Sequence, residues 1–153
     1  MAENSGIEWT HHTFNAWRGC QKVSAACDNC YAEELVTRRL GGEWGPHGER
    51  VLSKTTWASL PRWNRKAGDA GERHRVFCFS LADVLDNHKT IQQEWRDRFY
   101  GEVERHTNLD FLLLTKRPQN APKLFPERWM KDGLPSNVWM GATVEDQDEA
   151  ERR

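Results

Sequence analysis

The sequence contains no apolar run that approaches the roughly 18 residues needed for a membrane-spanning helix. Its polar start, residues 1–6, lacks the basic and apolar regions of a secretion signal. It also lacks an excess of positive charge, because 22 Lys and Arg stand against 23 Asp and Glu. Composition therefore gives no general attraction to nucleic acid, although a local basic patch is compatible with it. We expect a cytoplasmic protein with no membrane contact.

Cysteine is scarce, with only four residues in the chain, yet three of them fall within eleven residues as Cys20, Cys27 and Cys30. In a reducing compartment, clustered thiols favour metal binding over disulfide formation. Three thiolate ligands leave one coordination position open, which is typical of a catalytic metal rather than a structural one. These three cysteines are therefore the predicted metal ligands.

The second Cys-x2-Cys or Cys/His pair of a closed zinc site is absent from the sequence. The Cys-x2-Cys spacing that is present suits a [4Fe–4S] cluster, in which three thiolates leave one iron open for a chelating cofactor. Zinc stays the alternative metal. His11 and His12 precede the cysteines closely enough to offer a fourth ligand, or they are ordinary surface residues. Cys78 lies in an apolar run and is interpreted as a small buried side chain.

The pattern of apolar residues predicts alternating strands and helices. Runs of β-branched and aromatic residues predict strands at 13–19, 75–80, 109–115 and 137–144. Helical spacing with start and stop signals predicts helices at 31–40, 90–106, 120–124 and 126–130, and the first turns of another at 145–153. Thr90 is the predicted N-cap of the second of these. Residues 41–75 are the least regular segment, with one or two helical turns at 55–63 and a loop at 64–75.

Strands that alternate with helices at about 30-residue spacing indicate right-handed βαβ units around a parallel sheet. We predict an α/β fold with about four such units in a single domain, residues 1–153. A complete (β/α) barrel needs about 250 residues, so the chain resembles about half of a TIM-type barrel. It is interpreted as the N-terminal part of a larger barrel, or as an open sheet whose edge strand is covered by a protein partner.

Functional groups of parallel sheets gather at the carboxyl ends of the strands, and four loops of this chain carry such groups. The cysteines follow the first predicted strand, Asp83 the second, Lys116 and Arg117 the third, and Glu145 the fourth. Lys116 and Arg117 are candidates for anchoring a carboxylate or a phosphate, or they form a solvated pair. Asp83 is alternatively a turn or cap residue, and Glu145 an acid in the first turn of a helix.

A set of short motifs extends along the chain: Ile7-Glu-Trp-Thr, Phe14-Asn, Gly19-Cys20, Cys27, Cys30-Tyr-Ala-Glu, Ser80-Leu-Ala-Asp83, Leu114-Thr-Lys-Arg-Pro118 and Val138-Trp-Met-Gly-Ala-Thr-Val-Glu145. Together they resemble an uncharacterised family of phage and prophage proteins that carries a three-cysteine motif and is similar to radical S-adenosylmethionine enzymes. The resemblance runs from about residue 6 to the last residue.

The resemblance implies that the three cysteines hold a [4Fe–4S] cluster. S-adenosylmethionine would chelate the fourth iron through its amino and carboxylate groups before reductive cleavage yields a 5'-deoxyadenosyl radical. It makes Asp83 a candidate for the cofactor's amine, and Lys116, Arg117 and Glu145 candidates for contacting the cofactor or substrate. The sequence departs from the usual Cys-x3-Cys-x2-Cys spacing, since six residues separate its first two cysteines, and it lacks a glycine-rich segment after the second predicted strand.

Two functions are compatible with these observations. The first is an iron-sulfur enzyme of the radical S-adenosylmethionine type, in a phage setting, with nucleic acid as the candidate substrate. The second is a binding module without catalysis, in which zinc or a cluster stabilises a loop that presents a Trp-rich and basic surface to a protein or to nucleic acid.

Overall fold

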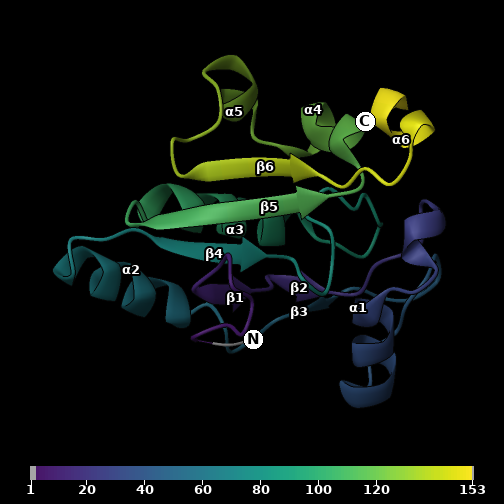
Figure 1. Ribbon diagram of the computed structural model, residues 1–153, viewed down its shortest axis with the longest axis horizontal. Helices are drawn as coiled ribbons and strands as arrows, with labels where there is room; N and C mark the ends of the chain where they lie inside the picture. The colour runs from purple at the N-terminus through teal and green to yellow at the C-terminus, as the bar shows by residue number, and fades with distance from the viewer. Residues whose placement is uncertain (1–2, 153) are drawn as a thin grey trace.

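Four runs of β-forming residues pair side by side in one parallel sheet. The computed structural model describes residues 3–152 and contains strands β1 (His12–Phe14), β4 (His74–Cys78), β5 (Leu109–Thr115) and β6 (Val138–Ala142). They hydrogen-bond in the order β1-β4-β5-β6, and every pair is parallel (Figure 1). Helical segments connect them, so the predicted α/β class is confirmed, and a partial barrel is compatible with this sheet.

The strand predicted at 13–19 is wrong in its extent, because the chain leaves the sheet after Phe14. Residues Trp17–Arg18 form a separate strand, β2, that pairs antiparallel with β3 (Val51–Leu52). Asn15 lies at the break, where its side-chain oxygen accepts a hydrogen bond from the Leu81 amide at 2.8 Å. The side chain therefore joins the end of β1 to the loop after β4, and a continuous strand would remove this contact.

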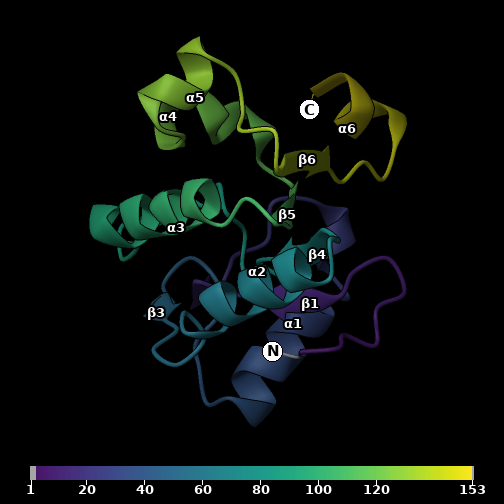
Figure 2. The ribbon, with the colours of Figure 1, turned by 90° about the vertical axis from the view of Figure 1, so that its left-hand side faces the viewer.

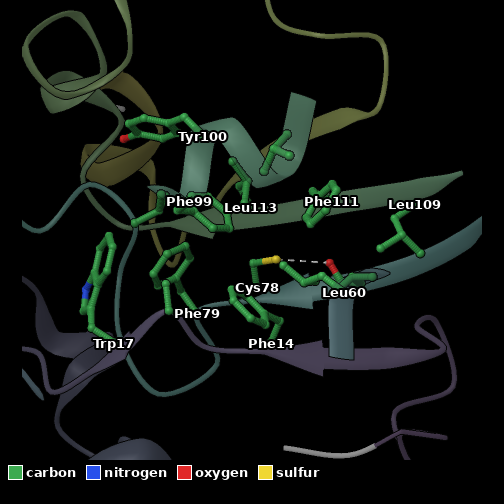
Figure 3. Packing of buried hydrophobic residues seen from close by; sticks show 14 of the residues in the cluster. Phe14, Trp17, Leu60, Cys78, Phe79, Phe99, Tyr100, Leu109, Phe111 and Leu113 are labelled. Carbon is green, nitrogen blue, oxygen red and sulfur yellow. Dashed lines mark hydrogen bonds between the residues drawn. The ribbon is translucent and has the colours of Figure 1, made fainter. Parts of the chain in front are cut away.

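Helices α2 (Ser59–Asp69), α3 (Gln93–Arg105) and α5 (Glu127–Lys131) cover one side of the sheet. Figure 2 shows the sheet nearly end-on, with α3 beside it. Alternate residues of β5 point into this layer, so Leu109, Phe111 and Leu113 are fully or almost fully buried. Figure 3 shows how aromatic rings from the strands and from α3 fill the interior. Cys78 lies among them with no exposed surface, as predicted.

Two helices differ from their predicted positions. Residues 64–69, predicted as loop, belong to α2, because Leu60, Trp63 and Ala67 recur at helical spacing and are buried together. Helix α3 begins at Gln93, and Gln92 rather than Thr90 stands at its N-cap position. Thr90 does not cap it, since the Thr90 hydroxyl instead accepts a hydrogen bond from the Arg50 amide at 3.0 Å.

The remaining elements are short. The predicted helix 31–40 is divided into α1 (Tyr31–Glu34) and a π-helix, η2 (Leu35–Arg39). A 3-10 turn, η1 (Ala25–Cys27), lies between Cys20 and α1 and ends at Cys27, the second predicted metal ligand. The segment after β5 forms η3 (Pro118–Asn120) and α4 (Ala121–Leu124), and β6 is followed by α6 (Gln147–Arg152). Within residues 3–152, no helix is long and apolar enough to cross a membrane.

The other side of the sheet is only partly covered. On β5, Leu112 is half-buried and Leu114 is 42% exposed. These two side chains point away from the helices, because neighbouring residues of a strand face opposite sides. On β6, Trp139 pairs with Leu112 and is 62% exposed. The sheet therefore has a helix-covered side and an apolar open side.

Candidate functional site

The loops that follow the four parallel strands meet around one cavity. Its volume is about 800 Å³, and its lining residues lie at the carboxyl ends of the strands. The arrowheads of β4, β5 and β6 mark this edge of the sheet on the right in Figure 1. The polar and ionisable lining of the cavity includes members of each loop: Cys20, Cys27, Cys30, Ser80, Asp83, Lys116, Arg117 and Thr143. The four loops therefore share one edge, as predicted. Glu145, two residues after Thr143, lies outside the cavity lining.

Each predicted ligand is positioned by a different piece of local structure. Cys20 follows Gly19, whose amide donates to the Leu81 carbonyl at 3.0 Å, and the Cys20 carbonyl accepts from the Gly45 amide at 2.8 Å. Cys27 is buried at the end of η1, whereas Cys30 is half-buried at the N-cap of α1. Cys30 therefore stands at a helix start, immediately before the helix predicted at 31–40. All three thiols are free.

The three thiols share a cavity but are not gathered around one point. Across residues 3–152, no three His, Cys, Asp or Glu side chains are grouped so that they could hold a metal ion. A tetrahedral zinc ion with Zn–S bonds of about 2.3 Å needs its sulfur ligands within about 4 Å of one another. A [4Fe–4S] cluster binds each thiolate to a different iron, so its ligands stand farther apart. The donor set and its shared cavity are therefore compatible with a cluster.

Asp83 and Arg117 form a buried ion pair behind the cysteine loop. An Arg117 Nη1 donates to Asp83 Oδ2 at 2.8 Å, and both side chains are at least 94% buried. The same carboxylate accepts from the Thr115 hydroxyl at 2.6 Å and from the Lys116 and Leu85 amides at 3.1 and 2.9 Å. Three of these four hydrogen bonds join the loop after β4 to the end of β5 and the loop that follows it, and the Leu85 bond lies within the loop after β4. These contacts give Asp83, a predicted cofactor contact, a structural role in joining the two loops.

Arg117 also reaches the cysteine loop. Its Nη1 lies 3.5 Å from the Cys20 sulfur, and its Nη2 donates to the Gln21 carbonyl at 2.8 Å. Burial raises the pKa of the Cys20 thiol to about 11, while the nearby guanidinium opposes that rise. A cation beside a cysteine sulfur stabilises negative charge on it. Arg117 is therefore placed to orient Cys20 and to balance charge there.

A second buried pair supports the same loop and was missed by sequence reasoning. Arg50 Nε donates to Asp86 Oδ2 at 2.8 Å, and neither side chain has exposed surface. Arg50 Nη1 also donates to the Gly45 and Gly48 carbonyls at 3.0 and 2.6 Å, which fixes the segment that binds the Cys20 carbonyl. No sequence signal marks this pair, because Arg50 lies in the least regular segment, 36 residues before Asp86.

Two further contacts close the site near β4. Asn15 Nδ2 donates to the Ser80 hydroxyl at 3.0 Å, and the Tyr31 hydroxyl donates to the Ser80 carbonyl at 2.9 Å. Phe79, just before Ser80, has a φ of 62°, a left-handed conformation that is rare for a side chain of this size. The chain turns sharply there, so the Ser80–Asp83 segment folds over the cavity instead of extending β4.

The two histidines considered as a fourth ligand lie at the opposite end of the sheet. His12 opens β1, and its Nε2 is 3.1 Å from Nδ1 of His74, the first residue of β4. His11 stacks on His74 with 4.8 Å between ring centroids. Since the cysteines follow the carboxyl end of β1, this placement is against a ligand role for either histidine.

A family described as a protein of unknown function, DUF5131, matches residues 4–153. No curated protein and no solved structure matches the chain.

Proposed function

We propose that this chain, which belongs to the DUF5131 family, is an iron-sulfur protein that acts with S-adenosylmethionine in the manner of radical enzymes. Cys20, Cys27 and Cys30 would hold a [4Fe–4S] cluster, and nucleic acid is the proposed substrate class. The observation that carries the proposal is the presence of all three thiols on the wall of one cavity, at the carboxyl edge of a parallel sheet. This edge is where enzymes with such sheets place their reactive groups.

A cluster held by the three cysteines would supply single electrons for cleavage of the cofactor, and the chain's own residues would position these groups. Arg117 holds the Cys20–Gln21 segment and sets a positive charge beside the Cys20 sulfur. Asp83 holds Arg117 in place. Lys116 lines the cavity next to them and is the proposed contact for an anionic group of the cofactor or substrate. Cys27, which is buried, and Cys30, which is half-buried, would bind the cluster from the side of the cavity formed by η1 and α1.

Anaerobic reconstitution with iron and sulfide tests the proposal, with metal analysis and absorption spectra as the readout. We expect about four irons per chain in the wild type, and a loss of most of this iron in single Ala variants of Cys20, Cys27 and Cys30. Cys78→Ala is the matched control, because Cys78 lies in the core and outside the cavity lining. It should keep its iron.

Three outcomes of this experiment would count against the proposal. One zinc per chain in place of iron would favour the zinc-stabilised alternative. Iron that is equally retained in the Cys30→Ala and Cys78→Ala variants would show adventitious binding. A cluster that forms but does not promote reductive cleavage of S-adenosylmethionine would leave an iron-sulfur protein of another type. Circular dichroism of each variant separates loss of ligand from loss of fold.

A further inference from the structure

The open side of the sheet carries a second hollow that continues the first. It has a volume of about 260 Å³ and is lined only by apolar residues and Gly141. Trp9, Phe77 and Leu114 line both hollows, so the apolar surface leads directly into the cavity that holds the cysteines. The two hollows therefore form one binding surface, which we call the open-face groove.

Aromatic side chains define this groove. Phe77, Leu112 and Trp139 stand in one register row across β4, β5 and β6. Trp9 packs on Phe77 with 4.8 Å between ring centroids, yet Trp9 is 46% exposed and Trp139 is 62% exposed. Four other tryptophans of the chain are almost completely buried. Two large indoles left in contact with solvent beside one groove indicate a binding surface rather than ordinary packing.

The charges along the groove are unlike those of the whole chain. Its charged lining residues are three cations, Lys22, Lys116 and Arg117, and one carboxylate, Asp83, whereas the whole chain has a formal charge of -1. Lys22 pairs with Asp28 at 3.5 Å and Arg117 with Asp83 at 2.8 Å. In the part of the chain that is described, Lys116 is in no ion pair. An anionic group is therefore favoured near Lys116.

We propose that the open-face groove binds a nucleotide, free or within a single strand, with its base stacked against Trp9 and Trp139 and its phosphate toward Lys116. An apolar aromatic wall beside a cationic end matches the two chemical parts of a nucleotide, a flat ring and a phosphate. Naming the nucleotide as the substrate rests on the proposed function, whereas the binding does not require a cluster. A polypeptide that covers the same face is the competing occupant.

Fluorescence anisotropy of a short fluorescein-labelled single-stranded oligonucleotide measures the binding, and competition by AMP distinguishes a free nucleotide from a strand. Base stacking contributes about 1–3 kcal/mol, so Trp9→Ala and Trp139→Ala should each weaken binding about 5- to 150-fold. Trp139→Phe should keep most of the affinity. Met130→Ala, which truncates another exposed apolar side chain on α5, is the control and should leave binding unchanged.

Lys116→Gln should weaken oligonucleotide binding and lower the slope of log affinity against log salt by about 1, because one phosphate contact is lost. The control is Lys131→Gln, at an exposed lysine on α5 that pairs with Glu127. Wild-type affinity in both Trp→Ala variants would overturn the proposal. A second result would also overturn it: the wild type binds neither probe and is an oligomer, and Trp139→Ala dissociates that oligomer. The open face of the sheet would then be an interface with another polypeptide.

The Cys30→Ala variant separates this inference from the proposed function. If it loses iron and still binds the oligonucleotide, both proposals stand. If the wild type takes up no iron but binds the probes through Trp9 and Trp139, the groove inference is supported and the proposed iron-sulfur function is rejected. If the wild type takes up iron and binds neither probe, the groove inference fails alone.

Discussion

At the scale of single residues, Arg117 links the cysteine loop to the loop after β4. One guanidinium bonds to a carboxylate, a backbone carbonyl and a thiol from two other loops, and only 3% of the side chain is exposed. Such a group cannot be replaced by lysine without loss, because an ammonium lacks the planar set of donors. The site therefore depends on arginine in particular, and not merely on a positive charge.

We predict that Arg117→Met lowers the free energy of unfolding by about 3–5 kcal/mol, because it leaves the buried Asp83 carboxylate without its cation. Urea denaturation measures the change. Arg128→Met is the control, since it breaks an exposed pair with Glu104 and should cost less than about 1 kcal/mol. If both variants lose the same free energy of unfolding, burial does not strengthen the Arg117–Asp83 pair.

Trypsin cleavage after Lys22 should also accelerate in Arg117→Met, because the cysteine loop loses its anchor at Gln21.

At the scale of secondary-structure elements, the turn that leads into the cysteine loop is tightly constrained. Gly19 has a φ of 101°, and a Cβ there would lie 3.1 Å from Arg50 Cδ and 3.3 Å from the Glu49 carbonyl oxygen. Gly41, which follows η2, also has a positive φ of 62°, but a Cβ there would meet nothing within 4 Å. A Cβ at Gly41 would therefore meet only backbone strain, whereas a Cβ at Gly19 would meet both backbone strain and steric crowding.

Gly41→Ala should lower the free energy of unfolding by about 1–2 kcal/mol, the cost of a left-handed conformation for a residue with a Cβ. Gly19→Ala should cost at least about 1 kcal/mol more, because its methyl group also presses on Arg50. Urea denaturation of both variants provides the test. If Gly19→Ala lowers the free energy of unfolding no more than Gly41→Ala does, the Arg50 side chain can move away from the added methyl group.

Elements also show what could be predicted from the sequence and what could not. The apolar runs of β4, β5 and β6 were visible, and so was the position of Cys30 at a helix start, because both depend on local pattern. The C-terminal half of α2 was missed, since Leu60, Trp63 and Ala67 stand among charged residues and before Gly68.

The buried pairs could not be predicted because they join distant segments. Arg50 meets Asp86 across 36 residues, and Arg117 meets Cys20 across 97. Nor does the local pattern separate the open side of the sheet from the covered side. Leu112 and Leu114 are as apolar as their buried neighbours on β5, and their partial exposure depends on what packs over the sheet. The iron-sulfur assignment stays a prediction.

At the scale of the whole molecule, the two ends of the sheet have different chemistry. The carboxyl edge holds the cavity, whereas the amino edge holds a cluster of histidines. His12 is buried, stacks on Trp63 with 4.2 Å between ring centroids and meets His74 at 3.1 Å. Burial, together with the neighbouring His74, lowers the pKa of His12 to about 4. Protonation of this side chain is therefore less favourable in the folded chain than in the unfolded chain.

The unfolded chain binds a proton at His12 near its ordinary pKa of about 6.5, whereas the folded chain does so only near pH 4. The stabilising effect of the neutral side chain is therefore complete above pH 6.5 and is lost as the pH falls toward 4. We predict a decrease in the free energy of unfolding of up to about 1.4 kcal/mol per pH unit in this window from His12.

Urea denaturation at pH 7 and pH 5 tests this effect of acid. His12→Gln should show a smaller decrease between the two pH values than the wild type, even if it is less stable at both. His47→Gln, at an exposed histidine, should behave like the wild type. If the free energy of unfolding of His12→Gln falls as much between pH 7 and pH 5 as that of the wild type, groups other than His12 cause the sensitivity to acid.

The contact between Arg117 and Cys20 also has a consequence for biosynthesis. Arg117 follows Cys20 by 97 residues, which at about 5–20 residues per second means a delay of about 5–20 s on the ribosome. All three cysteines are made before the cation that anchors their loop. The nascent chain therefore passes through an interval in which the thiols are present and the wall formed by β5 is not, and a cofactor delivered then would meet an open loop rather than a finished cavity.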